Sequence, residues 1–191
     1  MALTEEKRAL RGSMLAWRGS LDDETRRQAA NGLLDMWRLE RPVTAPAIVS
    51  GFWPMAEELD IRPLMTALAE QGCRLALPVV VAKKQPLLFR AWQPGDALEA
   101  GVFGTLHPSP QREVVEPDAL IVPLLAVDEE GWRLGYGGGF YDRTLERLRG
   151  RKKVTAIGVG FDGQLVPDVP HGPDDQRLDW LLTDKRACAF V

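Results

Sequence analysis

Four glycines lie between positions 135 and 139 of this 191-residue chain, in the segment Arg133-Leu-Gly-Tyr-Gly-Gly-Gly-Phe-Tyr-Asp-Arg143. An apolar, strand-like run, Ala119 to Leu125, precedes the segment, and a helix-like run, Asp142 to Leu148, follows it. Glycine tolerates positive φ and lets the backbone approach a ligand closely. The segment therefore predicts a loop whose peptide N–H groups, together with the start of the next helix, bind phosphate.

This loop differs from the two best-known phosphate-binding motifs. Phe140 stands where both the Walker A loop and the dinucleotide fingerprint require glycine, and no lysine follows it. A tight turn without a ligand is the alternative, because turns also use glycine. Four glycines exceed what a turn requires, and the flanking Arg133 and Arg143 favour an anion.

Apolar runs typical of buried strands alternate with helix-like segments along the chain. They predict an α/β fold: a three-layer α/β/α sandwich with a mostly parallel, Rossmann-like sheet. We expect a single domain, 1–191, in which an N-terminal helical hairpin, 1–40, packs on an α/β core, 45–191. The expected strands are 47–53, 74–81, 86–92 near an edge, 119–125, 154–161, 178–183 and 187–191. Residues 61–71 are expected to form a helix, and the Gly- and Pro-rich stretch 95–116 a long functional loop.

Composition limits the compartment and the partners. The net charge is −3, without the basic balance of a nucleic-acid-binding domain. The N-terminus lacks the apolar core of a secretory signal, and no apolar stretch reaches membrane-spanning length. Cys73 and Cys188 have neither metal-ligand spacing nor a disulfide pattern. We therefore expect a cytoplasmic monomer that acts on small molecules and binds neither nucleic acid nor membranes.

Taken together, the motifs resemble the 5-formyltetrahydrofolate cyclo-ligase family, also called methenyltetrahydrofolate synthetases, over nearly the whole chain. They are Lys7-Arg-Ala-Leu-Arg11, Trp53-Pro-Met-Ala-Glu-Glu58, Leu134-Gly-Tyr-Gly-Gly-Gly-Phe-Tyr-Asp-Arg143 and Arg177-Leu-Asp179. The resemblance implies an ATP-dependent ligase that uses Mg²⁺ and makes 5,10-methenyltetrahydrofolate from 5-formyltetrahydrofolate, with release of ADP and phosphate. It also implies that the γ-phosphoryl group is transferred to the formyl oxygen before N10 attacks the activated carbon.

The same resemblance implies roles for individual residues. The expected ATP-binding residues are Lys7, Arg8, Arg11, Arg133, Leu134, Gly135, Tyr136, Gly137, Gly138, Gly139, Phe140 and Tyr141. The expected substrate-binding residues are Trp53, Met55, Glu58, Tyr136, Gly137, Gly138, Gly139 and Phe140. Arg133, Tyr141 and Asp142 are the expected catalytic residues, and Asp142 and Asp179 are expected to hold Mg²⁺.

Ordinary structural roles stay open at several of these positions. Lys7 and Arg11, four residues apart, could form a solvated basic helix face. Glu58 could favour the start of the next helix instead of accepting hydrogen bonds from a pterin. Asp142 could be a first-turn helix acid, although a carboxylate beside phosphates is better explained by a bridging Mg²⁺. Asp179 could be a surface acid.

Two other functions stay open as well. A different phosphate-handling α/β enzyme, of the sugar-phosphate isomerase or CoA-transferase type, would act without ATP. A non-catalytic folate- or nucleotide-binding relative would bind its ligand without turnover. The chain also departs from the family at Asp174, where many relatives have histidine, so no contact is assigned to that position.

Overall fold

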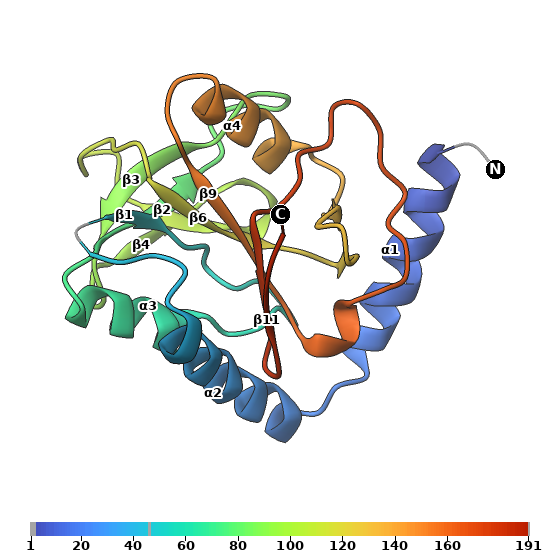
Figure 1. Cartoon of the computed structure of the whole chain (residues 1–191). Helices are drawn as coiled ribbons and strands as arrows, with labels where there is room; N and C mark the ends of the chain where they lie inside the picture. The colour runs from blue at the N-terminus through green and yellow to red at the C-terminus, as the bar shows by residue number, and fades with distance from the viewer. Residues whose placement is uncertain (1–2, 46, 191) are drawn as a thin grey trace.

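The computed structural model describes residues 3–45 and 47–190, so Met1 and Ala2 of the expected hairpin and Val191 of the expected last strand lie outside the described residues. Its main strands are β1 Ile48–Ser50, β2 Arg74–Val79, β3 Leu88–Trp92, β6 Ala119–Pro123, β9 Thr155–Val159, β10 Trp180–Leu182 and β11 Ala187–Ala189. They form one seven-stranded sheet in the order β11-β10-β9-β6-β1-β2-β3 (Figure 1).

The five central strands of this sheet are parallel, and the two outer strands, β3 and β11, are antiparallel to their neighbours. The predicted mostly parallel sheet is therefore confirmed. The central strands are short runs of apolar residues because both faces of a parallel sheet are covered. In β6, Leu120 and Val122 pack into one hydrophobic cluster and Ile121 into another, as the two-residue period of a strand requires.

Helices cover both faces of the sheet and make the three expected layers (Figure 1). On one face lie α2, Asp23–Glu40, and α3, Arg62–Glu70; on the other lies α4, Phe140–Arg149. Leu33 and Trp37 of α2 are fully buried in the cluster that contains Ile121. Leu145 and Leu148 of α4 are fully buried in the opposite cluster.

The first helix, α1, Leu3–Gly19, precedes α2 with a short connection, but the two helices diverge instead of packing lengthwise on each other (Figure 1). Met14 of α1 packs with Leu125 and Leu134 in a third, smaller cluster. The buried face of α2 belongs to the main core instead. In the described part of the chain the expected hairpin is thus two consecutive helices that cover different parts of the molecule, and α1 is left beside the glycine-rich loop.

Two small hairpins were not expected. One, β7 Ala126–Val127 and β8 Arg133–Leu134, separates β6 from the glycine-rich loop, so the loop joins β8 to α4 and not the central sheet to α4. The other, β4 Leu98–Ala100 and β5 Leu106–Pro108, lies inside the stretch 95–116, so the prediction of a loop throughout that stretch was wrong. Strands of two or three residues carry too little periodicity to be recognised in a sequence.

Candidate active site

A cavity of about 830 Å³ opens at the carboxyl edge of the central strands. The chain runs from β1 to β2 on one side and returns to pair β6 on the other side of β1, so the strand order reverses there. Ligands of open α/β sheets bind in the crevice that such a reversal creates. Phe52 and Trp53 after β1, Val80 after β2 and Pro123 at the end of β6 line it.

The glycine-rich loop has the backbone geometry of an anion cradle. Gly137 and Gly139 have positive φ, 95° and 62°, which residues with a side chain rarely adopt. Gly139 is also the residue that precedes the first turn of α4. The peptide N–H groups of residues 137–139 donate no hydrogen bond to any described residue. These donors, together with the positive end of α4, are available to an anion in the cavity.

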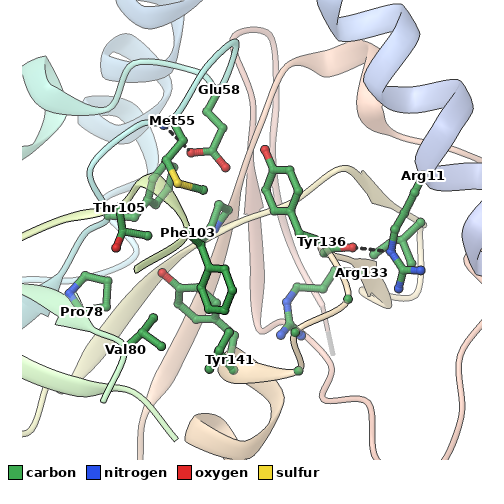
Figure 2. Close-up of a pocket in the computed structure, with 18 of the residues that line it drawn as sticks. Arg11, Met55, Glu58, Pro78, Val80, Phe103, Thr105, Arg133, Tyr136 and Tyr141 are labelled. Carbon is green, nitrogen blue, oxygen red and sulfur yellow. Dashed lines mark hydrogen bonds between the residues drawn. The ribbon is translucent and has the colours of Figure 1, made fainter. Parts of the chain in front are cut away.

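Helix α1 brings its basic side chains to this loop. Arg11 donates from Nε to the carbonyl oxygen of Gly135 at 2.8 Å (Figure 2), and Lys7 pairs with Asp175. Both Lys7 and Arg11 line the cavity. The structure leaves the neighbouring Arg8 exposed and outside the cavity wall.

Arg133 and Asp142 meet beneath the loop. Arg133 is only 8% exposed, and its Nη2 lies 3.0 Å from Oδ1 of Asp142. The backbone of Gln176 joins this pair: its carbonyl accepts from Arg133 at 2.7 Å and its N–H donates to Asp142 at 3.1 Å. The pair is thereby fixed at the cavity floor, with Oδ2 of Asp142 left for another partner.

Asp179, the second expected metal ligand, does not line the cavity. It precedes β10 and accepts hydrogen bonds from Arg149 at 2.9 Å and from the N–H of Ala156 at 2.6 Å. Ala156 is near the start of β9, so Asp179 lies at the amino ends of the parallel strands, whereas the cavity lies at their carboxyl ends. A carboxylate that the structure brings into the same cavity as Asp142, and that we had not assigned, is Asp175.

A buried carboxylate lies on the wall opposite the glycine-rich loop. Glu58 is 8% exposed; its Oε2 accepts from the N–H of Met55 at 2.8 Å, while its Oε1 has no hydrogen-bond partner among the described residues (Figure 2). Burial raises the pKa of Glu58 above its ordinary value. Trp53 and Met55 supply apolar surface beside it. A buried acceptor without a partner indicates a ligand that supplies donors.

Two tyrosine hydroxyls point into the space between these walls (Figure 2). Burial, reinforced by the charge of Glu58, raises the pKa of Tyr136 to about 12. The same two causes raise the pKa of Tyr141, whose hydroxyl is buried without a partner among the described residues. Both tyrosines are therefore neutral hydrogen-bond donors at physiological pH.

Sequence reasoning missed several residues of the cavity wall, among them Arg18, Phe103 and Asp175. Arg18 follows Arg11 by seven residues, a spacing of two helical turns that could have marked it as a member of the same face. Phe103, with a φ of 58° and 61% exposure, lies at the tip of the β4–β5 hairpin. It belongs to the stretch 95–116 that was expected to be functional, although no signal singled out this residue.

Fold and site together define an α/β protein with a glycine-rich loop facing an apolar, carboxylate-containing pocket. A sequence model of the 5-formyltetrahydrofolate cyclo-ligase family matches residues 3–184. The chain is 33% identical over 188 residues to the 5-formyltetrahydrofolate cyclo-ligase of Mycolicibacterium smegmatis, covering 94% of each chain. It is 38% identical over 150 residues to that of Escherichia coli K12, covering 76% of this chain and 82% of the relative.

Solved structures agree. The NMR structure of Aquifex aeolicus 5,10-methenyltetrahydrofolate synthetase matches with a TM-score of 0.81 and 28% identity, covering 96% of this chain and 92% of that one. A synthetase from Mycoplasma pneumoniae, at 21% identity and a TM-score of 0.75, shares the fold. The chain belongs to the 5-formyltetrahydrofolate cyclo-ligase family, and the predicted family, fold class and enzyme class are confirmed. None of the helices in the described residues is long and apolar enough to span a bilayer.

Proposed function

We propose that this cavity converts 5-formyltetrahydrofolate to 5,10-methenyltetrahydrofolate at the expense of ATP, releasing ADP and phosphate. The proposal rests on one observation: a single cavity contains, on two of its walls, hydrogen-bonding groups that have no partner among the described residues. The N–H groups of residues 137–139 offer donors to an anion, and Oε1 of Glu58 offers an acceptor to a ring with donors. Phosphate and pterin are the two ligands of this reaction that match them.

ATP would bind with its phosphates against the glycine-rich loop. The loop residues 134–141, with Lys7 and Arg11 on α1 and Arg133 beneath, line the relevant side of the cavity. Arg8, exposed at the helix surface, would act only through a contact with the outer part of the nucleotide. Phosphoryl transfer needs positioning and neutralisation of charge more than covalent chemistry from the protein, and this wall supplies both.

The pterin would bind against Glu58. Its amino-pyrimidinone edge carries two adjacent donors that a carboxylate can accept, and Trp53 and Met55 would flank the flat ring. Tyr136, Phe140 and the glycines between them would then lie between pterin and phosphates, where the formyl group must be. Tyr141, a neutral donor in the same space, would hydrogen-bond the formyl oxygen.

Two carboxylates of this cavity would hold Mg²⁺. Asp142 meets its described partners only through Oδ1, and Asp175 meets Lys7 and the N–H of Gly172 only through Oδ2. Each has an oxygen to offer, and Mg²⁺ usually binds one or two carboxylates together with phosphates. Bound there, Mg²⁺ would neutralise phosphate charge. We propose Asp142 and Asp175 as its holders; Asp179, at the other edge of the sheet, would support Arg149 instead.

The chemistry then balances with no protein nucleophile. The formyl oxygen attacks the γ-phosphorus, and the bond to ADP breaks. N10 attacks the activated carbon, loses its proton, and the phosphate leaves with the former formyl oxygen. Arg133 would stabilise the charge that moves during transfer while Asp142 holds it in place. We further propose that the protein works on these small molecules as a cytoplasmic monomer.

The proposal is tested by the absorbance of methenyltetrahydrofolate with purified protein and 5-formyltetrahydrofolate, with and without Mg·ATP. Product that requires Mg·ATP supports the proposal. Folded protein that forms product equally without ATP contradicts it, and so does protein that binds the folate but never turns it over.

A further inference from the structure

Helix α1 carries a buried arginine that the proposed reaction does not use. Arg18 is 2% exposed, and its Nε has no hydrogen-bond partner among the described residues. A guanidinium is seldom removed from water unless it meets a partner, because the loss of hydration is costly. The partner of Arg18 is Tyr136 of the glycine-rich loop: Nη2 donates to the hydroxyl, and the guanidinium carbon lies 5.6 Å from the ring centroid.

Tyr136 in turn faces Glu58. Figure 2 shows its hydroxyl directed toward the carboxylate, whose Oε1 lacks a partner among the described residues. Arg18 on α1 and Tyr136 on the loop act on Glu58, and Glu58 in turn acts on Tyr141 on α4. Of these, Arg18 alone carries a positive charge. Its charge and the nearby Tyr136 hydroxyl lower the pKa of Glu58, against the larger effect of burial.

The position of Arg18 on its helix strengthens this connection. Arg11 and Arg18 lie seven residues apart, two turns of a helix, and so share one face. Arg11 holds the carbonyl of Gly135 and Arg18 holds the side chain of the next residue, Tyr136. One helix therefore fixes the loop at two adjacent residues, one on its phosphate side and one on the side of Glu58.

We propose that Arg18 is a positioning residue of the folate pocket, which holds the Tyr136 hydroxyl toward Glu58 and supplies the positive charge that balances this carboxylate. The proposal rests on the proposed function, because its ligand is the pterin. Glu58 offers an acceptor on both oxygens only as a carboxylate. Without Arg18, burial favours the protonated acid, which presents a donor where the ligand also presents donors.

A purely structural arginine would behave differently. Its removal would loosen α1, which also carries Lys7 and Arg11, and would weaken ATP and folate binding together. A residue that acts through Glu58 weakens folate binding selectively and loses its effect when Glu58 is already neutral. A double-mutant cycle separates the two cases.

The experiment uses the full chain with Arg18→Met, Glu58→Gln and the double variant. Dissociation constants for 5-formyltetrahydrofolate and, separately, for Mg·ATP are measured by calorimetry between pH 5 and 8. We expect Arg18→Met to weaken folate binding about 10- to 100-fold, the range for a charge-assisted hydrogen bond. Its loss of affinity on acidification should begin at higher pH than in the wild type. In the Glu58→Gln background the same substitution should change folate affinity less than about threefold.

Two further variants keep the result interpretable. Arg38→Met removes an exposed arginine of α2 that pairs only with Asp35 among described residues, and it should leave both affinities unchanged. Arg18→Lys keeps the charge and should retain the wild-type pH profile. If Arg18→Met does not fold, Arg18→Gln, which also removes the charge, takes its place in the cycle.

Equal losses in both backgrounds, an unshifted pH profile, or parallel losses of folate and ATP affinity would each overturn the role of Arg18. Failure of the proposed function looks different: the wild type itself would bind no 5-formyltetrahydrofolate. In that case the proposed role of Arg18 in pterin binding would also be wrong. The cycle repeated by urea unfolding without ligand would still report whether Arg18 and Glu58 interact.

Discussion

Burial of Glu58, which suits the proposed contact with the pterin, lowers the stability of the folded protein at neutral pH. Its raised pKa means that the folded state favours the protonated acid more than the unfolded state does. The unfavourable contribution is absent below the unfolded-state pKa and fully present above the folded-state pKa. Neutral pH therefore destabilises the fold through Glu58 while providing the carboxylate that the proposed contact with a pterin requires. Such a conflict between stability and activity is common at functional sites.

Glu58→Gln should therefore stabilise the folded protein and weaken its binding of folate. We expect a higher melting temperature at pH 7, with the difference shrinking as the pH falls toward the ordinary carboxyl range. The Michaelis constant for folate should rise about 10- to 100-fold with little change for ATP, because a charged acceptor is lost. Scanning calorimetry measures the melting temperature, and steady-state kinetics measures the two Michaelis constants. A larger effect on ATP than on folate would show that the two ligands occupy the opposite walls, and the exposed Glu70→Gln is the control.

A second prediction about single residues concerns the three aspartates proposed or expected to hold Mg²⁺. Asp142→Asn and Asp175→Asn should each raise the Mg²⁺ concentration for half-maximal turnover by about tenfold or more, since each removes a charged metal ligand. Asp179→Asn should leave that concentration unchanged and lower thermal stability, because its carboxylate accepts from Arg149 and from the start of β9. Titration of activity with Mg²⁺ measures this. A metal dependence that changes in Asp179→Asn and not in Asp175→Asn would reverse the assignment.

Some site residues were predictable and others were not, for physical reasons. Lys7, Arg11, Glu58 and the glycines belong to contiguous motifs, and all of them line the cavity. Arg18 was missed because an arginine in an amphipathic helix is usually a surface residue. Its burial depends on Tyr136, which is distant in the sequence and accepts its hydrogen bond. Asp175 lies only four residues before Asp179, and a sequence cannot show which of two nearby acids the chain turns toward the cavity.

At the scale of elements, the glycine-rich loop depends on α1 and α4 for its shape. Arg11 holds Gly135 from α1, and Arg143 of α4 donates to the carbonyl of Gly138 at 2.5 Å. Both contacts use loop carbonyls, which leaves the N–H groups directed elsewhere. Apolar runs predicted β6 and β9 well, because strands buried on both faces have no polar positions. The loop's true neighbour, β8, has two residues and no readable pattern.

Gly138→Val tests the cradle. A Cβ at this position would lie 2.7 Å from the ring of Phe140 and would add bulk where phosphate must approach. We expect ATP affinity to fall by at least about tenfold, the effect of losing one or two hydrogen bonds to a charged group. Calorimetric titration with Mg·ATP measures it. A folded variant with wild-type ATP affinity would contradict a cradle at this loop.

Two helical glycines provide a matched pair for the packing of the N-terminal helices. A Cβ on Gly12 in α1 meets nothing within 4 Å, whereas one on Gly32 in α2 would collide with the carbonyl of Asp184. Gly12→Ala should stabilise the protein by about 0.5–1 kcal/mol through helix propensity. Gly32→Ala should destabilise it by about 1–3 kcal/mol through overpacking. Urea unfolding measures the free energy of unfolding of both variants. Equal changes in the two variants would mean that α2 does not approach Asp184 this closely.

At the scale of the whole molecule, the site joins segments that the sequence keeps far apart. Lys7 on α1 meets Asp175 near the C-terminus, and Arg18 meets Tyr136. The strand order that brings β1 between β2 and β6 creates the crevice these segments surround. Fold class was predictable because the alternation of buried strands and helices allows few architectures. The placement of α1 was not, since the partners of its basic face lie more than 100 residues away in the sequence.

The central claim is that ATP is used to make the formyl oxygen leave as phosphate. It is tested most directly with 5-formyltetrahydrofolate labelled with ¹⁸O in the formyl group, by following the isotope shift of released phosphate in ³¹P NMR. The account predicts one ¹⁸O atom in the phosphate for each methenyltetrahydrofolate formed. Unlabelled phosphate, released while product accumulates, would mean that ATP is hydrolysed by water and that the formyl oxygen leaves by another route.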